Sequence, residues 1–101
     1  MSKGIYYYEL GLQVCLKMNS PDYKTAAYIY SHIGEACDLD CNVWKCVESY
    51  EKAVEMASMM EPHDDELLAL FLGNVQVARQ HVVQIEKKII EREEIATKEH
   101  N

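Results

Sequence analysis

The sequence predicts an all-α protein, and three observations carry the prediction. Apolar residues recur at helical spacings of three and four, whereas the period-two alternation of strands never persists. Four Gly and two Pro are few for this length, so long helices are rarely interrupted. Apolar residues make up 49% of the chain, which is enough for a packed core. With 101 residues, we expect one helical domain spanning residues 1–101.

The first two helices are predicted over residues 3–18 and 21–38. In the first, Leu10, Val14 and Met18 recur at helical spacing. The break before the second helix contains Ser20 and Pro21. Ser can accept a hydrogen bond from a free backbone N–H, and Pro has no N–H to satisfy. We therefore expect Ser20 to cap the second helix and Pro21 to lie in its first turn.

The third and fourth helices are predicted over residues 43–60 and 64–98. Asp40 and Asn42 precede the third, and either side chain can accept hydrogen bonds from its first free N–H groups. The fourth begins after Pro62 with acidic residues, which suit the positive end of the helix dipole. No proline follows, and Gly73 is only a weak breaker. The fourth helix is therefore expected to be long and continuous.

An apolar seam runs along this fourth helix. Val75, Ala78, Val82, Ile85 and Ile89 alternate steps of three and four residues, as in a coiled coil. The seam is short, because an arginine occupies the next position. We predict that Val82, Ile85 and Ile89 form a surface for association with another chain.

Six residues of the second and third helices form a spaced pattern of small, apolar and aromatic side chains. They are Tyr30, Ile33, Gly34, Cys46, Tyr50 and Ala53. The pattern resembles the signature of tetratricopeptide repeats, in which two antiparallel helices meet through small residues. Small side chains let the helices approach closely, while the tyrosines fill the space beside them.

Both flanks repeat part of this pattern. The small-aromatic-small spacing of the third helix recurs 42 residues earlier, at Gly4, Tyr8 and Gly11. The apolar-Gly pair of the second helix recurs 39 residues later, at Leu72 and Gly73. The sequence thus predicts antiparallel, tetratricopeptide-like hairpins: one complete repeat between two half-repeats, with the last helix extended.

The resemblance implies a non-enzymatic scaffold, adaptor or assembly subunit that binds a peptide or helix in a groove. The residues that occupy the family's groove positions are Tyr28, Ser31, Glu35, Asp38, Leu67, Leu70, Asn74 and Val77. None of them is basic, so the acidic peptide tails that many family members bind are not favoured. Two acids beside apolar side chains favour a neutral-to-basic peptide or helix instead.

The formal charge of −7, without a basic stripe, argues against nucleic acid and anionic membranes as partners. No apolar run is long enough to insert into a membrane, and the first residues do not read as a signal peptide. We therefore expect a cytoplasmic protein with free cysteines and no cofactor.

A zinc site and a hydrolytic site are weaker alternatives. His32, Cys37, Cys41 and Cys46 surround one loop, but only Cys37 and Cys41 have the close spacing that structural zinc sites use. Buried packing explains the cysteines with fewer assumptions, and helix capping explains the His-Asp-Asp string at residues 63–65. No nucleophile motif or phosphate-binding loop is present in the sequence. We predict no metal site and no enzyme activity.

Repeat arrays usually need about three units for stability, and this chain shows barely two. We therefore predict a homo-oligomer or a subunit of a larger complex. The alternative function is a small cytosolic chaperone that sequesters one apolar client helix, as tetratricopeptide-type chaperones of type III secretion do.

Overall fold

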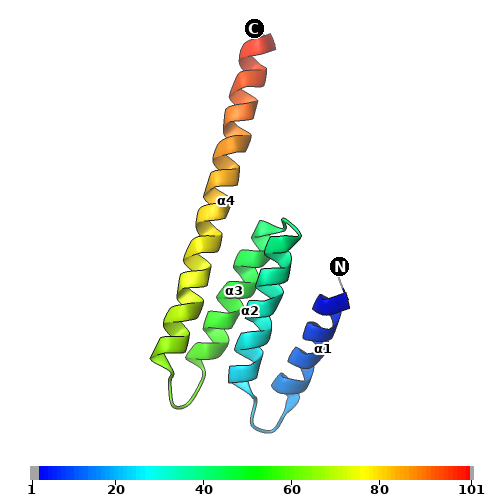
Figure 1. Cartoon of the computed structure of the whole chain (residues 1–101), viewed down its shortest axis with the longest axis vertical. Coiled ribbons are helices and arrows are strands. Elements are labelled where there is room, and N and C mark those ends of the chain that lie inside the picture. Colours follow the sequence, from blue (N-terminus) through cyan, green and yellow to red (C-terminus); the bar gives the residue numbers. More distant parts are fainter. Residues whose placement is uncertain (1–2, 101) are drawn as a thin grey trace.

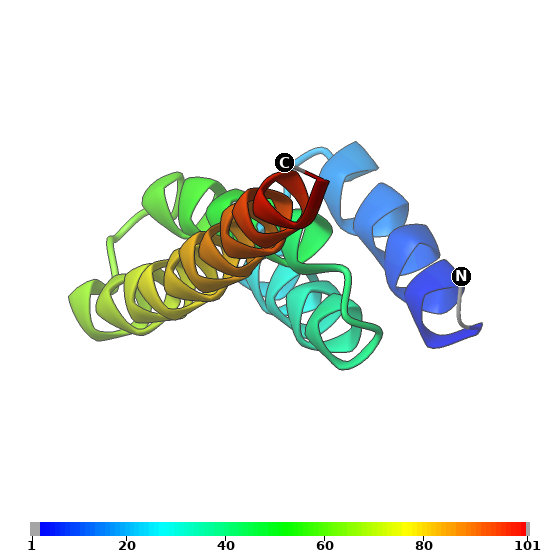
Figure 2. The ribbon, with the colours of Figure 1, turned by 90° about the horizontal axis from the view of Figure 1, so that it is seen from above.

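The computed structural model describes residues 3–100, which form four α-helices and no strand (Figure 1). They are α1 (Lys3–Lys17), α2 (Tyr23–Leu39), α3 (Val43–Ser58) and α4 (Asp65–His100). Successive helices run antiparallel, and α1 and α4 lie at opposite ends of the stack (Figures 1 and 2). The all-α prediction is confirmed, and α4 is continuous.

α2 packs against both α1 and α3, and α3 packs against α4. The core between them consists of small and medium-sized apolar residues around one large ring, that of Phe71, which is fully buried. Its other largest buried side chains are Cys37 and Cys46. Because most core residues are small, the helices lie close together in a thin layer, and the molecule measures 63 × 30 × 17 Å. The long dimension comes from α4, whose second half extends beyond the other helices (Figure 1).

The start of α2 differs from the prediction. The helix begins at Tyr23, and Asp22 is its cap. The Asp22 carboxylate accepts hydrogen bonds from the backbone N–H of Thr25 at 3.0 Å and from its hydroxyl at 2.7 Å. Ser20 therefore does not cap α2, because Asp22 lies three residues before Thr25 and can bind both of its donors. Pro21 lies before the helix, not in its first turn.

The connection from α2 to α3 is a tight turn. The backbone N–H groups of Cys41 and Asn42 donate to the carbonyls of Asp38 and Cys37, at 3.0 and 2.8 Å. This pair of bonds closes the end of α2 as a Schellman motif and requires the left-handed conformation seen at Cys41, with φ of 60°. Asn42 then caps α3 by accepting from the N–H of Lys45 at 3.3 Å. Asn42 thus takes part both in ending α2 and in starting α3.

The remaining helix ends lie close to the predicted ones. α1 ends at Lys17, one residue earlier than predicted, and α3 ends at Ser58, two residues earlier. Asp64 accepts a hydrogen bond from the N–H of Leu67 at 3.1 Å and caps α4, which agrees with the capping role expected for the acids after Pro62.

α2 and α3 approach each other closely at Gly34. A Cβ atom placed on Gly34 would lie 2.6 Å from Cε1 of the Tyr50 ring, closer than real side chains approach. Ala53 and Cys46, the other small residues of the pattern, are buried beside this contact. The close approach of the two helices therefore depends on these small residues, as the spacing predicted.

Candidate binding groove between α2, α3 and α4

A small cavity opens where the end of α2, the middle of α3 and the middle of α4 meet. It has a volume of about 110 Å³. Its lining consists of acidic, polar and small apolar side chains from the three helices: Asp38, Cys46, Tyr50, Asn74, Val77, Ala78 and His81. Because three separate helices build it, the cavity exists only in the folded hairpin stack.

The rim of this cavity carries the charge. Asp38 lies in the last turn of α2, and its Oδ1 atom is 3.8 Å from Nδ1 of His81 on α4. Glu35, one turn earlier on α2, is 3.6 Å from Nδ1 of His32. All four side chains are about half exposed, so both pairs are accessible to solvent and contribute little stability, and only Asp38 and His81 line the cavity.

The floor of the cavity is uncharged at neutral pH. Burial raises the pKa of the Cys46 thiol to about 11 and that of the Tyr50 hydroxyl to about 12. Negative charge on Cys46, Glu35 and Asp38 near the ring further disfavours a negative charge on the Tyr50 oxygen. The cavity therefore combines a neutral floor with an anionic rim.

The structure brings together only part of the groove predicted from the sequence. Asp38, Asn74 and Val77 line the cavity. Ser31 and Leu67, however, are buried in the core and present no surface to a peptide.

The other predicted groove residues lie around the cavity or beyond it. Tyr28 is exposed, and its ring centroid lies 5.7 Å from that of buried Phe71, edge to face. Leu70 is exposed on α4. Glu35 is close enough to Tyr50 to influence its pKa. These three residues extend the surface along α2 and α4.

Four lining residues were not predicted as groove residues: Cys46, Tyr50, Ala78 and His81. Cys46 and Tyr50 were interpreted as packing residues, and they do pack, but one side of each also faces the cavity. His81 was recognisable from the sequence, because it follows Asn74 and Val77 at the same spacing of three and four residues.

The predicted association residues lie where α4 leaves the stack. Val82 and Ile85 are half-buried and Ile89 is exposed, so the seam that is buried at Val75 and Ala78 emerges into solvent. Next to it, an apolar cavity of about 310 Å³ is lined by Trp44, Val47, Arg79, Val82 and Val83. This surface joins the beginning of α3 to the middle of α4.

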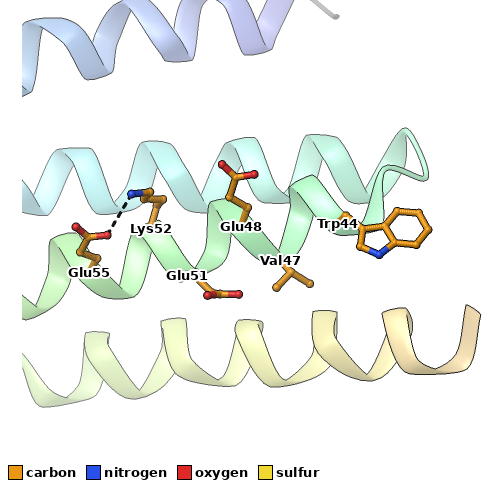
Figure 3. A pocket seen from close by; sticks show the side chains of 6 residues that line it. All are labelled: Trp44, Val47, Glu48, Glu51, Lys52 and Glu55. Carbon is orange, nitrogen blue, oxygen red and sulfur yellow. Dashed lines mark hydrogen bonds and ion pairs between the residues drawn. The ribbon is translucent and has the colours of Figure 1, made fainter. Parts of the chain in front are cut away.

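The outer face of α3 carries a shallow, mainly acidic depression of about 360 Å³ (Figure 3). Trp44 lies at one end of it, followed along the helix by Glu48, Glu51 and Glu55. Lys52 is paired with Glu55 at 3.4 Å. Glu51 is paired with Arg79 of α4 at 3.6 Å, so three carboxylates lie beside one lysine and one arginine, and the face keeps a small negative excess.

The cysteines do not form a metal site within residues 4–99. No three His, Cys, Asp or Glu side chains of these residues converge. Cys15, Cys37 and Cys46 are buried and Cys41 is exposed, all as free thiols. Burial raises the pKa of Cys37 as well as that of Cys46, so both remain protonated at neutral pH and are poor nucleophiles.

Comparisons with protein-family models, curated proteins and solved structures gave no match. Within the described part of the chain, no helix is both long enough and apolar enough to span a bilayer.

Proposed function

We propose that this chain is a non-enzymatic protein-interaction module that binds a neutral-to-basic peptide or helix in a tetratricopeptide-like groove. The observation that carries the proposal is the cavity between α2, α3 and α4, which has an anionic rim at Asp38 and a neutral floor at Cys46 and Tyr50. Such a cavity suits a Lys or Arg side chain that lies across its mouth, with the apolar stem over the neutral floor and the charge beside Asp38.

The surface around the cavity supports the same partner. Tyr28, Leu70 and Val77 are exposed and offer apolar contacts beside the two acids of α2. An amphipathic helix or an extended peptide with one or more basic residues would satisfy both kinds of contact. The acidic outer face of α3 adds long-range attraction for a positively charged partner.

The test is a titration of the chain with three amphipathic peptides of equal length and apolar content that differ only in charge: basic, neutral and acidic. Calorimetry should show tightest binding of the basic peptide, and this binding should weaken at high salt because the contributing ion pairs are exposed. Equal or tighter binding of the acidic peptide would rule out the proposed chemistry.

A pair of variants localises the binding. Asp38→Asn should weaken binding of the basic peptide roughly two- to fivefold, the effect expected of one exposed ion pair. Asp40→Asn, two residues away and outside the cavity, is the matched control and should leave binding unchanged. Equal losses in both variants would mean a diffuse charge effect without a defined groove.

The module is proposed to work as a cytoplasmic assembly subunit, with association through Val82, Ile85 and Ile89. Four free thiols support a reducing compartment. Ile85→Asp combined with Ile89→Asp should abolish this association and retain helix content, because the stack itself ends before these residues. Trp44, the single tryptophan, lies beside Val82 and reports burial of the surface by a blue shift of its emission. An unchanged sedimentation coefficient in the variant would remove the seam from the interface.

The same apolar surface supports a second candidate function, that of a chaperone for one apolar client helix. The cavity of Trp44, Val47, Val82 and Val83 favours it, because its lining is almost entirely apolar. Co-purification separates the two functions. A chaperone should hold a single small helical client, whereas an assembly subunit should sediment with many chains.

A further inference from the structure

The two ends of the helix stack expose apolar residues, and some of their counterparts in the central hairpin are buried. α1 carries an outward stripe of Tyr7, Leu10 and Val14, three and four residues apart, with Tyr7 66% and Val14 67% exposed. α4 carries Leu70 and Val77, 56% and 53% exposed, on either side of Gly73. Capped repeat stacks normally have polar outer faces, so both ends have the character of interfaces.

Two positions of the α4 stripe correspond to positions that α2 buries inside the stack, whereas the third, Val77, corresponds to the exposed Asp38. Displaced by 39 residues, Leu70 corresponds to Ser31 and Gly73 to Gly34. Ser31 is only 6% exposed, and Gly34 lies against the Tyr50 ring of α3. Around Gly73, in contrast, no atom of the described residues lies within 4 Å of the position of a Cβ. α4 therefore has a surface shaped to receive a helix, and no helix of the described chain covers it.

The stripe on α1 corresponds in the same way to positions of α3. Displaced by 42 residues, Tyr7 corresponds to Ser49 and Val14 to Met56 of α3. Those two α3 residues are 6% and 8% exposed, so α3 buries two of the three positions that α1 leaves open, whereas the third, Leu10, corresponds to the exposed Lys52. Within the described residues, α1 is thus an α3-like helix without an α2-like neighbour on its outer side, and α4 is an α2-like helix without an α3-like neighbour.

Charge also favours bringing these two faces together. Residues 1–20 contain two lysines and one glutamate, whereas α4 begins with Asp65 and Glu66. If α1 of one copy lay antiparallel to α4 of another, as α3 lies to α2, its Lys17 end would meet this acidic end. Pairing two α4 helices through the same face in parallel would instead place the acidic ends together.

We propose that copies of this chain stack head to tail, with the Tyr7–Val14 stripe of one copy seated over Gly73 on α4 of the next. The contact resembles the α2–α3 hairpin, but Tyr8, the counterpart of Tyr50, stacks on His32 of its own α2 and takes no part in it. Because the two faces differ, the association is heterologous and open-ended, so each added copy leaves a free α1 at one end and a free α4 at the other. The proposal does not require peptide binding or the Val82–Ile89 seam, but it uses Leu70 and Val77, which also belong to the proposed peptide surface, so stacking and peptide binding would compete there.

Two exposed substitutions test it, and each blocks one end. Both are made in the Ile85→Asp, Ile89→Asp background, so that association through the Val82–Ile89 seam does not contribute. Val14→Glu places a carboxylate in the α1 stripe, and Gly73→Glu places one over the α4 stripe. Neither side chain meets a neighbour within the monomer, so both variants should fold. The wild-type sedimentation coefficient should rise continuously with concentration. Each variant alone should associate at least about tenfold more weakly, because the carboxylate would be buried without a partner.

An equimolar mixture of the two variants decides the geometry. The intact α4 end of Val14→Glu fits the intact α1 end of Gly73→Glu, so the mixture should form dimers and stop there. If either variant alone still associates like the wild type, the contact is between identical faces and the proposal is wrong. Monomeric wild type over the whole concentration range would also refute it, as would a mixture that remains monomeric while the wild type associates.

Two controls separate this contact from others. Leu39→Glu makes the same kind of change at a residue that is 84% exposed and lies on neither stripe, and it should associate like the wild type. If it disrupts association, added charge alone is responsible. The Ile85→Asp and Ile89→Asp variant should retain head-to-tail growth. If growth stops in that variant, the seam of α4 is the interface and the stacking proposal is refuted, whereas peptide binding in the groove would be unaffected.

Discussion

Alanine substitution of two of the helical glycines, Gly34 and Gly73, should have opposite effects on stability. Each residue lies inside a helix, where Gly→Ala is worth about 0.5–1 kcal/mol of stabilisation when space is free. A Cβ at Gly73 enters open space, so Gly73→Ala should gain this amount. A Cβ at Gly34 would lie 2.6, 2.7 and 3.1 Å from three carbon atoms of the Tyr50 ring. The ring must then move as a whole.

The size of the difference follows from that contact. Overpacking a close helix contact costs about 1–3 kcal/mol, and the propensity gain is common to both variants. Gly34→Ala should therefore be less stable than Gly73→Ala by about 1–3 kcal/mol, and less stable than the wild type. For a domain of this size, each 1 kcal/mol corresponds to about 4–8 °C in Tm.

The assay is urea and thermal unfolding followed by far-UV circular dichroism, at a protein concentration low enough to keep the chain monomeric. The double variant Gly34→Ala with Tyr50→Leu should lose less than the sum of the two single variants, since the smaller side chain leaves room for the Cβ. Equal stability of Gly34→Ala and Gly73→Ala, or strict additivity in the double variant, would refute the close approach of α2 and α3.

Three further predictions concern helix ends and buried groups. Asp22→Ala should cost about 1 kcal/mol, because it removes the α2 cap. Hydrogen bonds from Thr25 lower the pKa of Asp22. The stabilisation by Asp22 is therefore complete above the ordinary aspartate pKa of about 3.9 and is lost as pH falls through the lower pKa of the folded state. The free energies of unfolding of wild type and variant should converge at that low pH. Burial raises the pKa of Cys46 to about 11 and that of Tyr50 to about 12, whereas their pKa values in the unfolded chain are about 8.5 and about 10. Stability should therefore be complete below the unfolded pKa values and fall as pH rises towards the folded ones. Urea midpoints that do not change at alkaline pH would contradict this. Cys41→Gly should be neutral or stabilising by up to about 1 kcal/mol, because φ of 60° suits Gly, whereas Cys41→Val should destabilise; similar midpoints for the two would argue against a left-handed turn.

The helices and most of their ends were predictable from the sequence because they depend on residues close together in the chain. Apolar spacing of three and four marked all four helices, and Asn42 and the acids after Pro62 marked two of their starts. The long α4 followed from the lack of a proline after Pro62. Even the wrong cap at Ser20 was a local error, since Asp22 lies two residues away and competes for the same donors.

The candidate site was only partly predictable, because it depends on which helix faces which. Ser31 and Leu67 have the spacing of groove residues but lie in the core, and no local signal distinguishes a residue that faces a neighbouring helix from one that faces solvent. His81 becomes a rim residue only because α4 runs beside the end of α2, which brings it 3.8 Å from Asp38. Residues more than forty positions apart in the sequence come together only when the chain folds.

The glycines show the same division most clearly. The sequence by itself placed Gly34 and Gly73 each directly after an apolar residue, 39 residues apart, inside two predicted helices. Only the tertiary structure decided that Gly34 lies under the Tyr50 ring while Gly73 faces open space. The physical reason is that a helix forms from its own residues, whereas the environment of each side chain depends on the helix packed next to it.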